Sequence, residues 1–196
     1  MKLSQGAEAR IFLENNEVVK DRFEKKYRHP VIDAELRKQR TRREAKILDK
    51  IYEMGFPAPK TILIDDKNGK LKMSFIEGEL VKNIIHKNHK KLSKEIGQKI
   101  ARLHGQNIIH GDLTTSNMIL KNNEIYFIDF GLGFFSEKIE DKAVDLHLIR
   151  QALESKHHQI WEECFNEVLE GYKSYPRYKE VFERLKVVES RGRNKQ

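Results

Sequence analysis

The sequence predicts an α+β protein built as two lobes, on three observations. Residues 1–77 alternate between strand-like segments and turns and contain one helical pattern. Residues 78–190 show mostly helical periodicity, interrupted by one short hairpin. Residues 191–196 carry basic side chains and no apolar ones. We therefore expect a β-rich N-lobe, a helical C-lobe and a basic tail, which suits a chain of 196 residues.

Two hairpins and one helix account for the predicted N-lobe. ARIFLENNEVVKDRF, residues 9–23, reads as two strands joined by an Asn-Asn turn. A helical pattern follows from residue 33 to about residue 52, before a glycine and two prolines. TILIDDKNGKLKMSFIEG, residues 61–78, gives two more strands around an Asn-Gly turn. We expect a mostly antiparallel sheet with one helix.

Helices dominate the predicted C-lobe. KKLSKEIGQKIARLHGQN, residues 90–107, places Leu92, Ile96, Ile100 and Leu103 on one helical face. The hairpin MILKNNEIYFIDF turns at an Asn-Asn pair. Three further helical patterns close the chain, with these apolar faces: Val144, Leu148, Ile149 and Ala152; Trp161, Phe165, Val168, Leu169 and Tyr172; Val181, Phe182, Leu185 and Val188.

Composition limits the compartment and the partners. Cys164 is the only cysteine, which excludes an internal disulfide and a cysteine-based zinc cluster and favours a reducing cytoplasm. No apolar run reaches the length of a signal-peptide core or a membrane span, so no membrane attachment is expected. The formal net charge of +8 favours an acidic partner such as nucleic acid or nucleotide, or else a well-solvated surface.

A polar stretch, HGDLTTSN, lies between two apolar runs of the C-lobe. It contains Asp112 and Asn117, and Asp129 follows in IDFG at the end of the hairpin. Mg²⁺ prefers oxygen ligands and binds through one or two carboxylates together with phosphate oxygens, which suits Asn117 and Asp129. Asp112 is placed to orient or accept a proton from an attacking nucleophile.

The order D-x-x-x-x-N followed by D-F-G resembles the protein-kinase signature, and both spacings match. The resemblance implies a reduced bilobal protein-kinase-like fold that uses ATP and Mg²⁺. It requires a strand lysine for the phosphates and a helix glutamate as its partner, for which Lys20 and Glu44 are the candidates. The alternatives are a surface lysine and a solvated glutamate at the edge of the helix stripe.

The nucleotide-binding segments are less regular. The phosphate loop Ser4–Ala9 holds one glycine, Gly6, followed by Ala7, in place of a glycine-rich motif. Its backbone N–H groups are the expected phosphate donors. Met73, Ser74 and Ile76 fall at the hinge, where backbone groups of Ser74 and Ile76 would contact adenine.

Several departures from a protein kinase narrow the expected chemistry. His110 and Gly111 precede Asp112, so the usual arginine that binds a phosphorylated loop is absent. Only thirteen residues separate Gly131 from Asp145, without an A-P-E motif, which leaves little platform for a peptide. Asp145 either supports the catalytic loop or is a helix-start residue favoured by the dipole.

Five histidines outside the loop are expected at the surface, since no carboxylate or thiolate completes a metal site. His110 is instead expected to support the loop by packing and hydrogen bonds. The surface group comprises His86, His89, His104, His157 and His158.

The chain as a whole resembles the small atypical kinase subunit of the KEOPS complex, the p53-related protein kinase family of archaeal type. KDRFEKKYRHPVIDAELRKQRTRREAKIL, residues 20–48, is similar to the segment that follows the family's lysine. HGDLTTSN and IDFGLG resemble its catalytic segments, and SRGRNK resembles its basic C-terminal tail. The resemblance covers nearly the whole chain.

This resemblance implies an atypical serine/threonine kinase or ATPase that supports threonylcarbamoyl-adenosine modification of tRNA. It also implies binding to the threonylcarbamoyl-transferase subunit through the C-lobe, and to other KEOPS subunits. With little room for a peptide, water is the easiest phosphate acceptor, while the chain itself and a partner serine stay open. The chain is either free-standing or one domain of a fusion with its transferase partner.

Basic residues are candidates for tRNA contact. The tail residues Arg191, Arg193 and Lys195 would contact phosphates, or form a solvated terminus. The helix bearing Arg37, Lys38, Arg40, Arg42 and Arg43 has the same two interpretations.

Two rival functions stay open. A Rio-like protein kinase would transfer phosphate to a partner serine, and related small-molecule kinases would need a larger acceptor pocket than residues 132–196 offer. A catalytically silent RNA-binding scaffold would not need Lys20, Glu44, Asp112, Asn117 and Asp129 together.

Overall fold

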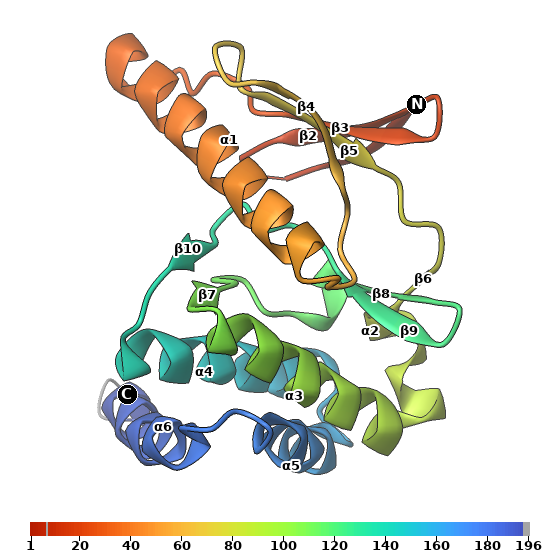
Figure 1. Cartoon of the computed structure of the whole chain (residues 1–196), viewed down its shortest axis with the longest axis vertical. Coiled ribbons are helices and arrows are strands. Elements are labelled where there is room, and N and C mark those ends of the chain that lie inside the picture. The colour runs from red at the N-terminus through yellow and green to blue at the C-terminus, as the bar shows by residue number, and fades with distance from the viewer. Residues whose placement is uncertain (7, 194–196) are drawn as a thin grey trace. The chain divides into compact units, whose positions relative to one another are not determined.

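The computed structural model of the chain describes residues 1–6 and 8–193, with side chains as far as Arg191 (Figure 1). It divides into two compact units. The sheet unit comprises Met1–Glu77 with Phe130–Leu132, and the helical unit comprises Gly78–Asp129 with the chain from Gly133 onward. Among the described residues, no helix has the length and apolar character needed to cross a membrane.

The sheet unit contains a five-stranded antiparallel sheet in the order β1-β2-β3-β5-β4. Both predicted hairpins are present. Asn15 and Asn16 have φ values of 50° and 62°, and Gly69 has φ 69°, which is the left-handed backbone that tight hairpin turns require. The strands are β1 Lys2–Gln5, β2 Arg10–Glu14, β3 Glu17–Asp21, β4 Thr61–Asp65 and β5 Lys70–Ser74.

Helix α1, Pro30–Glu53, packs along one face of this sheet (Figure 1). It begins earlier than residue 33 because Pro30 stands at the start, where its missing N–H and fixed φ are compatible with a helix. Ile47, Leu48 and Ile51 are fully buried on its inner face. Glu44 shares that face and is only 1% exposed, so a carboxyl group lies inside the apolar layer.

The helical unit consists of helices with two small antiparallel sheets, β6-β8-β9 and β7-β10. Its elements are β6 Glu79–Leu80, α2 Val81–Ile84, the 3₁₀ turn η1 Ile85–Lys87, α3 His89–Gly105, β7 Ile108–Ile109, the 3₁₀ turn η2 Thr115–Asn117, β8 Met118–Lys121, β9 Glu124–Phe127, β10 Phe134–Phe135, α4 Ile139–Lys156, α5 Trp161–Tyr172 and α6 Tyr178–Arg193.

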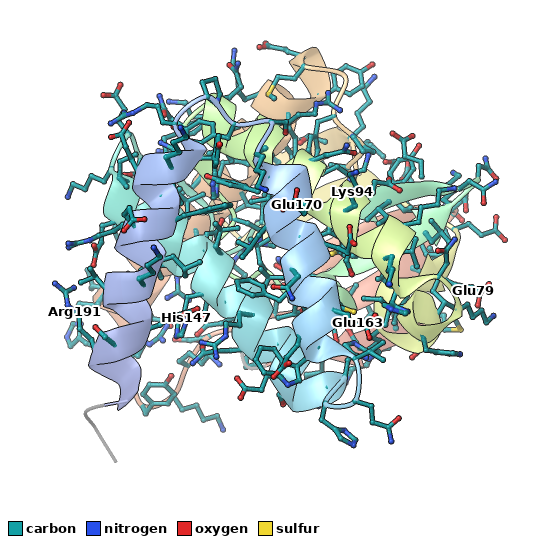
Figure 2. The ribbon with its side chains drawn as sticks, turned by 90° about the horizontal axis from the view of Figure 1, so that it is seen from below. Glu79, Lys94, His147, Glu163, Glu170 and Arg191 are labelled. Atoms are coloured by element: carbon teal, nitrogen blue, oxygen red, sulfur yellow. The ribbon has the colours of Figure 1, made fainter. Side chains whose placement is uncertain are left out.

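Helices α3 and α5 form the most extensive helix–helix contact among the described residues of this unit. The four apolar residues predicted for the inner face of α3 are all buried. Gly97 on α3 and Gly171 on α5 have no room for a side chain, because a Cβ on either would lie 2.0 Å from a backbone oxygen of the other helix. Figure 2 shows the opposite face of α5, where Glu163 and Glu170 are exposed.

The predicted inner face of α4 is wrong in part. Ile149 is buried as expected, but Val144 is 38% exposed, and the helix also buries Leu146 and Leu153. The physical reason is that Lys142 and Asp145 lie inside as well, at 0% and 1% exposure. Asp145 was a candidate for this face as a support for the loop, whereas Lys142 was not expected there, so the observed face is rotated relative to the predicted one.

Candidate functional site: the polar loop and a buried lysine–glutamate pair

The HGDLTTSN loop runs from β7 to β8 and folds back on itself. Asn117 Nδ2 donates to the carbonyl of Asp112 at 2.9 Å and to Asp112 Oδ2 at 2.8 Å. These bonds lock the two side chains together and leave Asn117 Oδ1 as the atom suited to a cation. The backbone N–H of Ile128 donates to the carbonyl of Asn117 at 2.9 Å, which ties the loop to the segment that leads to Asp129.

Asp145 supports the loop from α4. Its Oδ2 accepts the backbone N–H of His110 at 2.8 Å, and its Oδ1 accepts that of Gly111 at 2.9 Å. Gly111 has φ 78°, a conformation that glycine adopts without strain. Asp145 lies in the second turn of α4, so the support interpretation holds and the helix-start interpretation is wrong.

A buried histidine continues this support. His104 is 0% exposed, and its Nε2 lies 3.2 Å from Asp145 Oδ2 while its Nδ1 lies 2.7 Å from the Tyr172 hydroxyl. A neutral ring satisfies both contacts when Nε2–H donates to Asp145 and the tyrosine O–H donates to Nδ1. Burial lowers the pKa of His104, although the Asp145 hydrogen bond opposes the shift. The predicted surface position of His104 is therefore wrong.

Two other histidines hold the loop directly. His110 is fully buried; its Nε2 lies 3.2 Å from the Ile128 carbonyl, and its Nδ1 accepts the Asp112 N–H at 3.3 Å. Burial lowers the pKa of His110 as well. His157 was expected at the surface, but it is half-buried and its Nε2 contacts the Thr115 hydroxyl at 3.0 Å. The loop is thus fixed at several points.

Asp129 follows β9 with φ 62°, a left-handed conformation that is uncommon for residues other than glycine. Such backbone strain often accompanies a functional position. No group of three or more His, Cys, Asp or Glu side chains in the described part of the chain forms a ready metal cluster. A carboxylate and an amide oxygen still fit Mg²⁺ that is bound together with phosphate oxygens.

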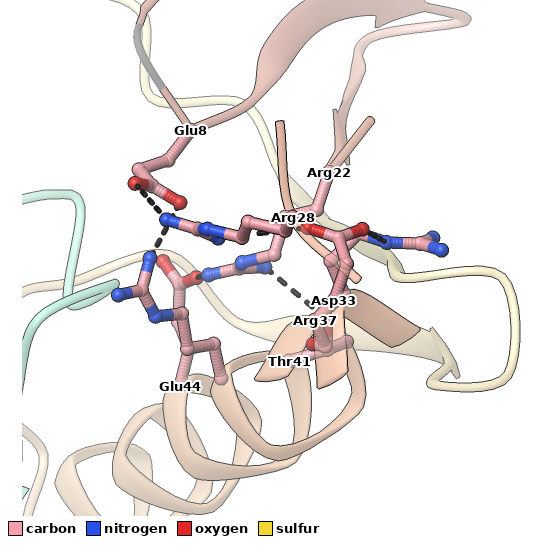
Figure 3. Close-up of polar contacts among 8 residues, drawn as sticks. Glu8, Arg22, Arg28, Asp33, Arg37, Thr41 and Glu44 are labelled. Atoms are coloured by element: carbon pink, nitrogen blue, oxygen red, sulfur yellow. Dashed lines mark hydrogen bonds and ion pairs between the residues drawn. The ribbon is translucent and has the colours of Figure 1, made fainter. Parts of the chain in front are cut away.

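In the sheet unit, Lys20 and Glu44 are in contact. Lys20 Nζ on β3 donates to Glu44 Oε1 on α1 at 2.8 Å, and their exposures are 6% and 1%. The surface alternatives for both residues are therefore wrong. A second cation, Arg22, bonds the other oxygen of the same carboxylate. Figure 3 shows Arg22 and Glu44 within a larger polar network at α1.

The sequence of this chain is similar to that of known proteins over most of its length. The family profile of the RIO domain matches residues 5–133. The KEOPS complex subunit Bud32 of Pyrococcus abyssi is 44% identical over 211 residues, which cover 98% of this chain and 96% of that protein. The chain belongs to the Bud32 family of RIO-domain proteins.

Two further similarities concern chain organisation and fold. The Bud32-family chain is 42% identical to a probable bifunctional tRNA threonylcarbamoyladenosine biosynthesis protein of Methanobrevibacter smithii, over 97% of this chain and 36% of that protein. A crystal structure of the Rio2 kinase from Chaetomium thermophilum superimposes with a TM-score of 0.65 at 15% identity, over 98% of this chain and 70% of that one. The predicted kinase-like α+β fold is therefore confirmed.

The segments that the sequence predicts to contact the nucleotide lie in the sheet unit of this Bud32-family chain. Gly6 N–H donates to the Ala9 carbonyl at 3.0 Å, and Ala7 lies outside the described residues. Ser74 N–H donates to the Lys60 carbonyl at 2.9 Å, so an adenine contact of Ser74 has to use its carbonyl. The side chains of Met73 and Ile76 are buried, at 6% and 8% exposure.

The basic residues of α1 are largely engaged within the chain, which weakens their RNA interpretation. Arg37 bonds Asp33, Arg40 bonds Glu8, and Arg42 bonds Asp66. Glu8 and Asp33 each contact a further arginine, Arg28, as Figure 3 shows. The network extends from Glu8, in the predicted phosphate loop, to α1.

In the tail, Arg191 lies within α6 and pairs with Glu140 at 3.0 Å. Figure 2 shows Arg191 near the end of this helix. The side chain of Arg193 and the whole of Lys195 lie outside the described residues.

Two supporting residues were missed, and the sequence held a signal for each. Arg22 follows Lys20 by two, so a strand places both on one face. His104 follows Ile100 by four and continues the buried face of α3.

Proposed function

We propose that this chain binds Mg-ATP and acts as the kinase or ATPase subunit of a KEOPS complex, supporting threonylcarbamoyl-adenosine modification of tRNA. The locking of Asn117 onto Asp112, with both amide contacts below 3 Å, carries the proposal. This geometry orients one amide oxygen for a cation and holds a carboxylate beside it. A polar loop without a ligand would not need such support.

Each site residue has a proposed role. Lys20, oriented by Glu44, neutralises phosphate oxygens, and the loop containing Gly6 and Ala7 contributes backbone N–H groups. Asn117 and Asp129 hold Mg²⁺, which supplies charge neutralisation on the phosphates when bound. Met73, Ser74 and Ile76 border the adenine, with the Ser74 carbonyl as an acceptor.

Asp112 would orient the phosphate acceptor. When water attacks the γ-phosphorus, a new P–O bond forms as the bond to the β-phosphate oxygen breaks, and Asp112 takes the released proton. A serine hydroxyl of the chain or of a partner would react in the same way. The short segment between Gly131 and Asp145 favours water, since it offers little surface for a peptide.

The proposed partners are the threonylcarbamoyl-transferase subunit, bound through the helical unit, other KEOPS subunits, and tRNA through the basic tail. The bifunctional relative supports this, because this chain corresponds to only 36% of its length. Its printed name assigns the whole protein to threonylcarbamoyladenosine biosynthesis. A cytoplasmic location follows from such a partnership.

The test follows the γ-phosphate of labelled Mg-ATP, with the chain alone and with transferase and tRNA. Asp129→Ala serves as the blank, and Asp49→Ala, an exposed aspartate of α1, as the matched control. We expect free phosphate to rise with partner and tRNA, and Asp112→Ala to abolish the rise. Normal phosphate release by Asp112→Ala would contradict the assigned role.

The same experiment separates the rival functions. Acid-stable label on the protein would indicate a Rio-like serine kinase, and hydroxylamine-sensitive label would indicate an aspartyl phosphate, the group named in the Rio2 complex. No turnover above the blank, with tRNA still bound, would indicate an RNA-binding scaffold.

A further inference from the structure

The Glu44 carboxylate is shared by two buried cations. Lys20 Nζ donates to Oε1 at 2.8 Å, and Arg22 donates from Nη2 to Oε2. The three residues are 6%, 3% and 1% exposed, in the order Lys20, Arg22, Glu44. Each carboxylate oxygen therefore has its own cationic donor, which is the satisfied state that a buried charge requires.

Arg22 is fixed by its backbone as well as by its guanidinium. Its N–H donates to the Gly69 carbonyl at 3.0 Å, which holds it against the turn between β4 and β5. Its Nη1 lies 3.3 Å from the Thr41 hydroxyl, and that hydroxyl donates to the Arg37 carbonyl at 2.8 Å. Figure 3 shows the guanidinium reaching α1 beside Thr41 and Glu44.

The planar guanidinium group, with several N–H donors, explains why position 22 holds an arginine. Thr41 and Glu44 are three residues apart on α1, so they lie on one face, one turn apart. One guanidinium reaches both side chains, whereas a lysine ammonium offers a single point charge. Arg22 thereby connects the end of β3 to one turn of α1.

Glu44 contacts two cationic side chains, one at each carboxylate oxygen. Without Arg22, Oε2 would lose its charge-assisted donor while the carboxylate stays buried. The carboxylate would then be held from one side only, and its hydrogen bond to Lys20 would be less well oriented.

We propose that Arg22 is a positioning residue for Lys20: it holds the second oxygen of the Glu44 carboxylate, so that Glu44 keeps Lys20 oriented for a nucleotide phosphate. This inference rests on the proposed function. Arg22 acts through Glu44 and is not assigned a contact with the nucleotide. The phosphate affinity of Lys20 then depends on a side chain outside the lysine–glutamate pair.

The experiment measures the dissociation constant of Mg-ATP by calorimetry and unfolding by urea on the full chain. The variants are Arg22→Met, Glu44→Gln and the double variant. Arg37→Met is the matched control, because it removes an ion pair with Asp33 on the same helix without touching Glu44. If Arg22→Met does not fold, Arg22→Lys replaces it, since it keeps the charge but loses the fork.

We expect Arg22→Met to raise the dissociation constant about tenfold, the effect of losing one charge-assisted contact, and Arg22→Lys to raise it about threefold. Arg37→Met is expected to lower stability and leave the constant within about twofold of the parent. In the Glu44→Gln background, Arg22→Met should raise the dissociation constant by less than about twofold, because the effect of Arg22 passes through Glu44.

Three outcomes would overturn the inference. Unchanged affinity in Arg22→Met with lowered stability would make the residue purely structural. A full tenfold effect that persists in Glu44→Gln would mean that Arg22 acts without Glu44. A parent chain that does not bind Mg-ATP would overturn the proposed function itself, whereas binding by the parent with no Arg22 effect overturns this inference alone.

Discussion

Asp145 Oδ1 accepts a hydrogen bond at 2.9 Å from the backbone N–H of Gly111, thirty-four residues earlier in the chain. The other oxygen of the same carboxylate binds the neighbouring N–H of His110. Because Asp145 is 1% exposed, both N–H groups would lose a buried acceptor without it. One side chain of α4 therefore sets the backbone from which Asp112 projects.

Replacing Asp145 is expected to loosen the loop. Asp145→Asn keeps the size but presents an amide N–H to one of the two donors, so we expect a loss of about 2–4 kcal/mol in unfolding free energy. Phosphate release should fall about tenfold or more. Urea unfolding and the labelled-ATP assay measure the two effects. Asp141→Asn, a partly exposed aspartate of the same helix, is the control, and equal behaviour of the two variants would contradict the support role.

Stability is expected to fall in mild acid because of two buried histidines. Burial holds the pKa of His104 and of His110 below their ordinary value of about 6.5. The unfolded chain therefore binds these protons first, so the stabilisation is present above pH of about 6.5 and is lost as pH falls toward the lower folded pKa values. The slope reaches about 1.4 kcal/mol per pH unit for each histidine.

Urea unfolding between pH 5 and 8 measures this slope. His104→Gln should remove the contribution of one histidine to this slope. His158→Gln, which replaces an exposed histidine, should leave the slope unchanged. A pH-independent parent, or a His104→Gln slope equal to the parent's, would show that His104 is not the titrating group.

Close packing of α3 on α5 is expected to depend on two glycines. Gly97→Ala would bring a Cβ to 2.0 Å from the Val168 carbonyl oxygen, and Gly171→Ala would do the same at Lys94. Because these are backbone atoms, the helices have to separate, and we expect a loss of about 2–3 kcal/mol. Gly105→Ala, with nothing within 4 Å, should gain about 0.5 kcal/mol. Thermal or urea unfolding measures these changes in stability. Equal stabilities of the three variants would contradict the close packing of α3 on α5.

The tail is expected to contribute to RNA affinity by charge. Removing residues 192–196 deletes Arg193 and Lys195, so the slope of log affinity against log salt should become shallower by about 1–2. Arg191→Gln is the comparison, because Arg191 already pairs with Glu140. Filter binding of tRNA over a salt series measures the slope, and an unchanged slope after truncation would exclude the contact.

Turns and apolar stripes were readable from local sequence. The Asn-Asn turn at Asn15 and the Asn-Gly turn at Gly69 were recognisable because few residues tolerate a positive φ. The α3 face was recognisable because its apolar residues repeat at helical spacing. Glu44 was recognisable because it interrupts such a stripe.

Errors arose where polar side chains are buried. His104 and Lys142 look like surface residues in a sequence, and both are fully buried. Lys142 Nζ finds the Asn107 side chain at 3.0 Å and the Ser136 carbonyl at 3.2 Å, partners distant in the chain. Such partners exist only after folding, so burial of a polar residue is not a local property.

The resemblance to protein kinases implied the pairing of Lys20 with Glu44. By itself, the sequence determined the two hairpins, the α3 core face and the kinase-type signature around Asp112, Asn117 and Asp129. These depend on short-range backbone preferences and on motif spacing. Only the tertiary structure decided that Arg22 shares the Glu44 carboxylate and that His104 and Tyr172 stand behind Asp145. The reason is that a buried ion or ring nitrogen takes whichever partner the packing of distant helices and strands brings within about 3 Å.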